Sequence, residues 1–219
     1  MMRVWRLLGL IVIMAGCAPV IIGSGPRITE PALTPTHIAA ADGARLPLRQ
    51  WRAYGKAKAV ILGLHGFNDY SKSFEEPAKA WVRAGLTVYA YDQRGFGAAP
   101  GWGLWPGVAA LADDLAAATR LIRARHPGLP LFVVGESMGA AVILSAVAGK
   151  TPPNADGYVL SAPAVWARHT MPVYQRAALW FGAHTAPWMR LTGRGAARQR
   201  PRILPLTLPM TKTSTRLFC

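Results

Sequence analysis

The sequence predicts an α/β fold in which helices cover both faces of a doubly wound, mostly parallel sheet. Two patterns carry this prediction. Short, continuously apolar runs such as residues 59–64 (AVILGL) are typical of strands buried on both faces of a parallel sheet. These runs alternate along the chain with segments of helical period, which is the order of elements in such a sheet.

The elements follow one another in a regular order from residue 37. Residues 37–51 form a hairpin that turns at Asp42-Gly43, a pair of residues suited to a tight turn. Further strands are expected at 59–64, 86–91, 131–135 and 157–161, and helices at 74–84, at 108–125 and from Met138 onward.

The helix expected at 108–125 has one apolar face. That face combines Val108, Leu111, Leu115 and Ile122. Asp113 and Asp114 lie near the start of this helix, where the dipole favours negative charge.

The first 16 residues have the layout of a secretory signal peptide. Two arginines precede an apolar run that is too short to span a membrane, and Ala15-Gly16 leads directly into Cys17. This arrangement resembles the bacterial lipoprotein signal, in which the chain is cut before the cysteine and its thiol then carries lipid. The alternative is an ordinary signal peptide with an incidental cysteine. We expect an exported protein of the bacterial cell envelope, lipid-anchored through Cys17, with residues 17–35 as a tether.

Composition excludes several other classes of protein. Hydrophobic residues make up 52% of the 219 residues, too many for a disordered polypeptide. Nearly half of the net charge of +15 lies in residues 190–219, which hold seven basic and no acidic side chains, and the basic tail, residues 192–219, is expected to be disordered. Its arginines lack interleaved aromatic residues, so no nucleic-acid partner is expected. No Cys/His spacing is typical of a metal site, and no metal or cofactor is expected.

The stretch Gly135-Glu136-Ser137-Met138-Gly139 lies between an expected strand and an expected helix. In this context it matches the nucleophile elbow G-x-S-x-G, which presents a serine on a strained turn at a helix N-terminus. The flanking glycines allow the strand and the helix to approach closely. His65-Gly66-Phe67 follows an earlier strand, so the backbone amides of Phe67 and Met138 are expected to converge as an oxyanion hole.

Four motifs together resemble the monoacylglycerol lipase, lysophospholipase and serine aminopeptidase S33 group of the α/β-hydrolase superfamily. They are H-G-x-x-[DE] at residues 65–69, D-x-R-G-x-G at 92–97, the elbow at 135–139, and Ser161-Ala162-Pro163. The resemblance extends over a partial α/β-hydrolase domain, residues 36–191.

The resemblance implies that Ser137 attacks a carboxylic ester of a lipid and forms an acyl-enzyme that water releases. Lysophospholipids and monoglycerides are the implied substrates. The chain order of the family is serine, acid, histidine, so His65 is expected to brace its loop rather than act as the base. Glu136 is expected to be exposed, while Asp69, Asp92 and Arg94 are expected to hold loops through hydrogen bonds.

Residues 165–190 fall where the family inserts a lid over the active site. Trp180, Phe181, Trp188 and Met189 then line an acyl-chain entrance or touch a membrane. The alternative is an ordinary helix pair packed on the sheet.

The triad acid and base are not found after Ser137. The only acidic residue there is Asp156, which precedes its strand, whereas catalytic groups gather at carboxyl ends. His169 and His184 both lie in the lid-like segment. We therefore expect a shortened or frameshifted hydrolase whose C-terminal strands are missing and whose activity is weak. A non-catalytic relative that binds lipid or a partner is the alternative.

Overall fold

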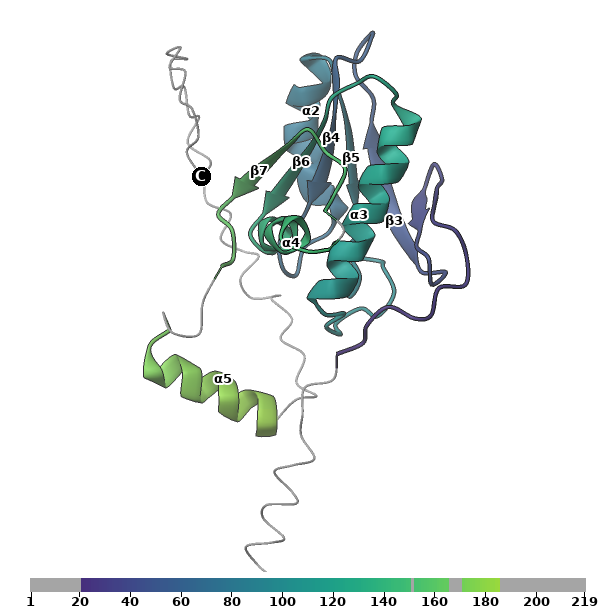
Figure 1. The fold of residues 1–219 in the computed structure, drawn as a ribbon. Coiled ribbons are helices and arrows are strands. Elements are labelled where there is room, and N and C mark those ends of the chain that lie inside the picture. The colour runs from purple at the N-terminus through teal and green to yellow at the C-terminus, as the bar shows by residue number, and fades with distance from the viewer. Residues whose placement is uncertain (1–20, 151, 166–170, 186–219) are drawn as a thin grey trace, which may run out of the picture.

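A computed structural model describes residues 21–150, 152–165 and 171–185 of the chain (Figure 1). The expected signal peptide, Cys17, Trp188, Met189 and the basic tail lie outside these described residues. His169 also lies outside them.

The core of the structure is a seven-stranded sheet with the order β1-β2-β3-β5-β4-β6-β7. Strands β4, β5, β6 and β7 run parallel, and β1, β2 and β3 precede them in antiparallel pairs. The expected hairpin and parallel strands are confirmed. The strands are β1 (Ala32–Leu33), β2 (His37–Ala39), β3 (Arg45–Trp51), β4 (Ala59–Leu64), β5 (Leu86–Tyr91), β6 (Leu131–Glu136) and β7 (Gly157–Ser161).

Helices lie on both faces of this sheet, as a doubly wound fold requires (Figure 1). Helices α3 and α4 cover one face and α2 covers the other. The expected helices are confirmed, with a short 3₁₀ turn η1 ahead of α2. The helical elements are η1 (Ser71–Phe74), α2 (Glu75–Arg83), α3 (Val108–Arg125), α4 (Met138–Val147) and α5 (Val173–Thr185).

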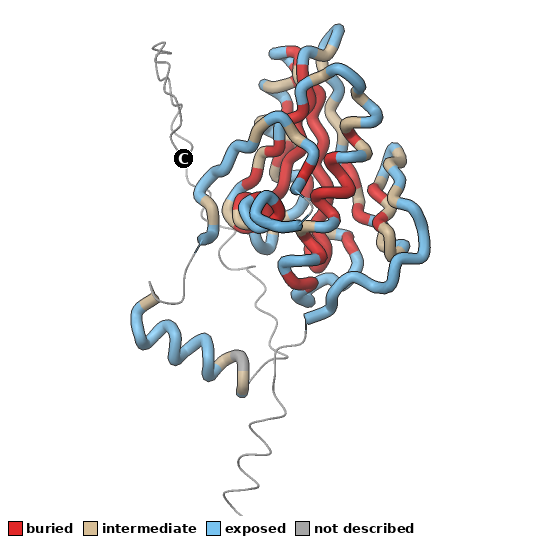
Figure 2. Tube along the Cα trace, in the orientation of Figure 1, coloured by how far each residue is buried: buried red, intermediate tan, exposed pale blue. Residues whose placement is uncertain are grey.

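Two apolar clusters hold the sheet between its helices. The larger one joins α3 and α4 to the strands through residues such as Leu62, Leu115 and Ile143, and the smaller one lies under α2 around Ile61 and Val88. Figure 2 shows the burial concentrated in the strands and in the helix faces toward them. All six residues of β4 are buried, as its continuously apolar sequence predicts.

Helix α3 differs from the expectation at two positions. Val108 was expected on the buried face but is 48% exposed, at the first residue of the helix. Asp113 and Asp114 were expected near the helix start, where the dipole favours negative charge, but the first turn of α3 holds no acidic residue. Asp114 is buried instead and forms an ion pair with Arg94.

Part of the segment expected to be a tether lies along the domain. The amides of Ile28 and Thr29 both donate to the carbonyl of Ala41, at 2.8 and 3.0 Å. Residues 32–33 then add β1 to the edge of the hairpin. From residue 21 onward, this segment therefore follows the surface of the fold.

The other edge of the sheet is much less covered. Val159 of β7 is 53% exposed, and its neighbours Tyr158 and Leu160 are also exposed. Helix α5 stands apart from the sheet in Figure 1, and Figure 2 shows it as almost wholly exposed. In the ranges that the structure describes, no helix is long and apolar enough to cross a membrane.

Candidate active site

Ser137 lies at the sharp turn between β6 and α4. Its backbone has φ 51° and ψ −109°, a region that residues other than glycine seldom occupy. The serine is partly exposed, while Met138 and Gly139 behind it are buried. This geometry is the strained strand-turn-helix arrangement that the G-x-S-x-G pattern predicts, and it directs the side chain away from the helix that follows.

The two flanking glycines are required by close approach. A Cβ on Gly135 would lie 2.6 Å from the amide nitrogen of Ala140, at the start of α4. A Cβ on Gly139 would overlap the carbonyl oxygen of Leu64 in β4. Neither position has room for a side chain, because the helix packs directly on the strands at this point.

The backbone around Ser161-Ala162-Pro163 forms hydrogen bonds with the turn at Ser137. The amide of Ser137 donates to the carbonyl of Ser161 at 2.9 Å, and the carbonyl of Ser137 accepts from the amide of Ala164 at 3.0 Å. The chain between these two bonds turns at Ala162, with φ 43°. Hydrogen bonds from β7 and the loop after it therefore hold the strained serine backbone in place.

The loop after β4 lies next to the serine. A Cβ on Gly66 would lie 3.5 Å from the Cβ of Ser137, so the absence of a side chain there keeps the space beside the serine open. Phe67 follows Gly66 in this loop, and Met138 is the first residue of α4, whose amide has no acceptor within the helix. The loop that carries Phe67 therefore lies beside the turn that carries Ser137 and Met138.

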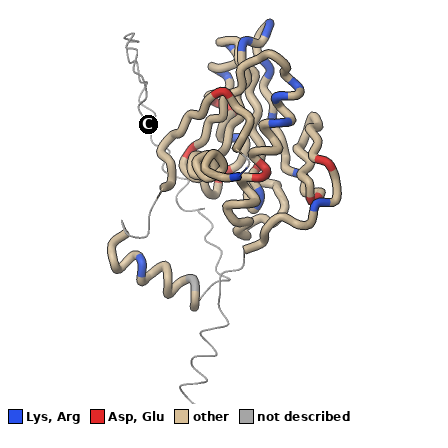
Figure 3. The backbone as a smooth tube through the Cα atoms, viewed as in Figure 1, with Lys and Arg blue, Asp and Glu red and all other residues tan. Residues whose placement is uncertain are grey.

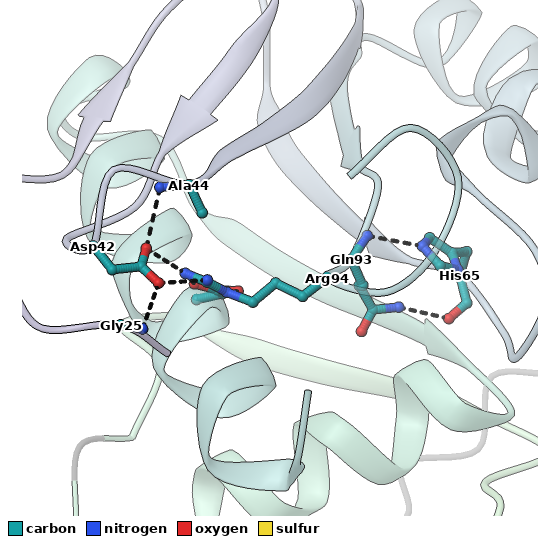
Figure 4. Close-up of polar contacts among 7 residues, drawn as sticks. Gly25, Asp42, Ala44, His65, Gln93 and Arg94 are labelled. Carbon is teal, nitrogen blue, oxygen red and sulfur yellow. Dashed lines mark hydrogen bonds and ion pairs between the residues drawn. The ribbon is translucent and has the colours of Figure 1, made fainter. Parts of the chain in front are cut away.

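His65 is fully buried and both of its ring nitrogens are engaged. Figure 4 shows its two contacts with Gln93. The amide of Gln93 donates to Nε2 at 3.0 Å, so the proton resides on Nδ1, which donates to the carbonyl of Gly66 at 2.8 Å. Burial lowers the pKa of His65 and keeps the ring neutral. His65 therefore joins the loops after β4 and β5, in agreement with a bracing role.

Arg94 anchors the loop after β5 through two carboxylates. Its guanidinium donates to Asp114 at 2.6 and 3.0 Å and to Asp42 at 2.6 and 2.8 Å. Figure 4 shows Arg94 reaching Asp42 while the neighbouring Gln93 turns toward His65. The hydrogen bond from Arg94 holds the pKa of Asp42 well below its usual range, whereas burial raises the pKa of Asp114 to about 6.

Asp92 fixes a further pair of loop segments. Its two carboxylate oxygens accept from the amides of Ser71 and Ala98, each at 2.9 Å. Asp69 accepts from the amide of Tyr70 at 2.9 Å. These contacts and those of Arg94 agree with the expectation that the three residues hold loops.

The structure does not bring a described acid or histidine from beyond β6 to Ser137. Asp156 precedes β7, where it accepts from the amide of Leu131 at 2.7 Å and pairs with Arg123 at 2.8 Å. His184 lies in α5 and bonds to the carbonyl of Trp180 at 2.7 Å. Glu136 is exposed, as expected.

A surface pocket of about 490 Å³ lies beside the site rather than at the serine. Its walls come from residues 47–49 in the middle of β3, from Tyr70 and Ser71, and from Asp92, Gly97 and Ala98. Ser137 is not among the residues that line it. Within the described ranges, no three His, Cys, Asp or Glu side chains gather in a way that could hold a metal ion.

Sequence reasoning missed the ion cluster of Asp42, Arg94 and Asp114. Asp42 was assigned only to a hairpin turn and Asp114 only to a helix end. The three positions are separated by 52 and 20 residues, and no local pattern links them. The sole signal was the presence of a charged residue, Arg94, in a loop between a buried strand and a charge-free segment.

Comparison with known proteins finds one matching family and several similar lipases. The sequence profile of a family described as "Serine aminopeptidase, S33" matches residues 55–204. Human monoglyceride lipase is 31% identical over 151 residues, which cover 65% of this chain and 50% of the human protein. The monoacylglycerol lipase of Mycolicibacterium smegmatis is 29% identical over 128 residues, covering 58% of this chain and 45% of that protein.

Solved structures show the same fold. A soluble variant of the Saccharomyces cerevisiae monoglyceride lipase, in complex with a substrate analogue, aligns with a TM-score of 0.55 at 23% identity, over 78% of this chain and 56% of the yeast one. An esterase from Exiguobacterium antarcticum aligns with a TM-score of 0.54 at 18% identity, over 67% of this chain and 54% of that one. The chain spans about half the length of the curated relatives that it matches.

Proposed function

The chain belongs to the serine aminopeptidase S33 family of α/β-hydrolases, and from this premise we propose that it is a hydrolase of lipid carboxylic esters with Ser137 as the nucleophile. The substrate class is that of monoglyceride lipases and lysophospholipases. The observation that carries the proposal is the strained backbone of Ser137 at φ 51°, in a partly exposed position at the N-terminus of α4. Strain of this kind persists only where surrounding structure enforces it, and it clusters at catalytic sites.

The proposed reaction begins with attack of Ser137 Oγ on the ester carbonyl carbon. The carbonyl oxygen gains negative charge as the tetrahedral intermediate forms, and the amides of Phe67 and Met138 stabilise it. The C–O bond to the alcohol then breaks, the proton that the Ser137 hydroxyl has lost passes through water to the leaving oxygen, and the acyl group remains on Ser137. Water attacks the acyl-enzyme in the second half of the reaction and releases the acid.

We further propose that this 219-residue polypeptide is a weak catalyst. The serine needs a general base, and the four described histidines all bond elsewhere: His65 in its loop, His184 within α5, His37 to Thr34 and His126 to Tyr89. If the described residues are the whole site, the oxyanion hole and substrate binding alone supply roughly 10³–10⁴-fold acceleration over water in well-built sites.

A second candidate function is non-catalytic binding of lipid or of a partner. The exposed aromatic residues of α5 favour it, since Trp180 and Phe181 are 44% and 61% exposed. A group of exposed apolar side chains is a common feature of interaction sites. The segment would then bind without ester cleavage.

The proposed location is the bacterial cell envelope. Cys17 follows a short apolar run and two small residues, and lipid attached to its thiol would anchor the exported chain to the membrane. An anchored enzyme of this class meets its lipid substrates at the membrane surface.

A fluorophosphonate probe tests the nucleophile directly. With the purified full chain we expect slow labelling that disappears in Ser137→Ala, together with weak hydrolysis of monoacylglycerol or lysophospholipid. Rapid labelling would contradict the proposed lack of a base. Retention of lipid with no labelling at all would favour the binding function, and labelling that persists in Ser137→Ala would remove the serine from its role.

A further inference from the structure

An apolar surface patch forms where the N-terminal segment meets the loop before α3. The amide of Ile22 donates to the carbonyl of Trp105 at 3.0 Å, and Ile21 forms a bridge with the same residue. A Cβ on Gly107 would lie 2.9 Å from the side chain of Ile21. We call Ile21, Ile22, Leu104, Trp105 and Val108 the N-terminal patch.

Every member of the N-terminal patch exposes much of an apolar side chain. The exposed fractions are 62% for Ile21, 45% for Ile22, 40% for Leu104, 37% for Trp105 and 48% for Val108. The two segments that build the patch carry no charged side chain between residues 18 and 26 or between residues 95 and 112. Charge-free apolar surface with an exposed tryptophan is typical of contact with the interface of a bilayer.

The N-terminal patch and Ser137 lie at the same end of the parallel strands. The loop that carries Trp105 follows β5, and Ser137 follows β6, so both lie at the carboxyl ends of parallel strands. Phe96 of this loop packs against Phe67 and His65, with ring centroids 5.4 and 5.8 Å apart. Figure 3 shows that most lysines and arginines of the domain lie toward its opposite end.

Chain length connects the patch with the proposed lipid anchor. Cys17 precedes Ile21 by four residues, and four residues span at most about 15 Å even when fully extended. A lipid on Cys17 would therefore hold the N-terminal patch close to the bilayer surface. This step rests on the proposed anchor, whereas the exposure of the patch does not.

We propose that the N-terminal patch is a second membrane contact, which inserts into the bilayer interface. This contact orients the domain so that the carboxyl ends of the parallel strands, where Ser137 lies, face the lipid. Insertion stays at the level of the headgroups, because the irregular loop around Trp105 has backbone groups that hydrocarbon could not satisfy. A bilayer is the occupant that the neighbouring anchor site favours. A second copy of the chain is the competing occupant.

A fluorophore placed in the patch tests the proposal. The full chain carries Cys219→Ser and Leu104→Cys, labelled with an environment-sensitive dye, and is mixed with vesicles of phosphatidylethanolamine and phosphatidylglycerol. The matched control carries Tyr54→Cys instead. Tyr54 is 70% exposed and follows β3, at the amino ends of the parallel strands and so away from the patch. We expect a blue shift and quenching by brominated lipid at position 104 and neither at position 54.

Three outcomes would overturn the proposal. The dye at position 104 could stay in water while the protein sediments with vesicles, the protein could fail to sediment, or position 104 could become buried without vesicles in a dimer. Lipid on Cys17 and probe labelling of Ser137 are measured separately by mass spectrometry, so failure of the anchor or of the hydrolase is distinguishable from failure of the patch.

A pair of substitutions gives an independent readout that does not depend on the dye. In a Cys17→Ser chain, which cannot be lipidated, Ile22→Ser with Leu104→Ser should weaken vesicle binding roughly tenfold, because both exposed apolar side chains are lost. Tyr54→Ser should leave binding unchanged. Equal binding by both variants would refute the contact.

Discussion

Helices α4 and α5 both contain many apolar residues but have opposite surroundings, and α5 also carries Gln175, Arg176 and His184. In α4, the residues Met138, Ala140, Val142 and Ile143 are buried against the strands. In α5, none of the large apolar side chains that the structure describes is buried, and Val173 and Tyr174 are more than 70% exposed. Large apolar side chains alone therefore do not place a helix against the sheet, since those of α5 stay exposed.

The two helices also differ in how closely their glycines are packed. Gly139 allows the backbone of α4 to reach that of β4, so the helix can hold the serine turn from behind. Gly182 of α5 has no atom within 4 Å of the place where its Cβ would lie. Helix α4 thus packs tightly behind the nucleophile, whereas α5, in the lid-like segment, has no packing partner among the described residues.

The largest expected effect on stability is that of removing Arg94, which lies in the packed domain rather than in α5. Arg94→Leu leaves Asp42 and Asp114 buried without their cation, and we expect the free energy of unfolding to fall by about 3–5 kcal/mol in urea denaturation. The matched control is Arg27→Leu. Arg27 pairs with Glu30 at 2.8 Å on the surface, with side chains 63% and 85% exposed, so its loss should change stability by less than about 1 kcal/mol. Equal effects of the two changes would contradict the structural role of the cluster.

The next effect compares the two helices directly. Gly139→Ala forces a methyl group into the backbone of β4 and should lower the free energy of unfolding by about 1–3 kcal/mol, together with loss of fluorophosphonate labelling. Gly182→Ala meets no neighbour and should leave stability unchanged or raise the helicity of α5, since alanine favours a helix by about 1 kcal/mol over glycine. If Gly182→Ala proved as destabilising as Gly139→Ala, α5 would have to pack more closely than the structure shows.

The smallest effect is a pH dependence caused by His65. Burial lowers its pKa in the folded state below the ordinary value near 6.5, so the unfolded chain binds a proton more readily. Stability contributed by the neutral ring is present above that value and is lost as the pH falls, by at most about 1.4 kcal/mol per pH unit.

The His65→Asn variant isolates this contribution. Asparagine keeps a donor and an acceptor but does not titrate, so the difference in unfolding free energy between variant and wild type should shrink as the pH falls below about 6.5. Partial burial also lowers the pKa of His126, and its contribution cancels in this difference. A difference that is constant from pH 7.5 to pH 5 would mean that folding does not shift the pKa of His65.

Local sequence was sufficient for the elements and for the elbow. Continuous apolar runs predicted the parallel strands, and Gly135 and Gly139 around Ser137 predicted a strained turn with no space for side chains. These features depend on residues close together in the chain, and periodicity and glycine placement report on such contacts directly.

Only the tertiary structure decided which distant residues meet. It joined Asp42 and Asp114 through Arg94, engaged His65 with Gln93, and laid Ile21 beside Trp105. It also packed α4 on the strands and left the aromatic residues of α5 exposed. The physical reason is that ion pairing and burial depend on the complete arrangement of the chain, and residues far apart in sequence carry no periodic signal of their contact.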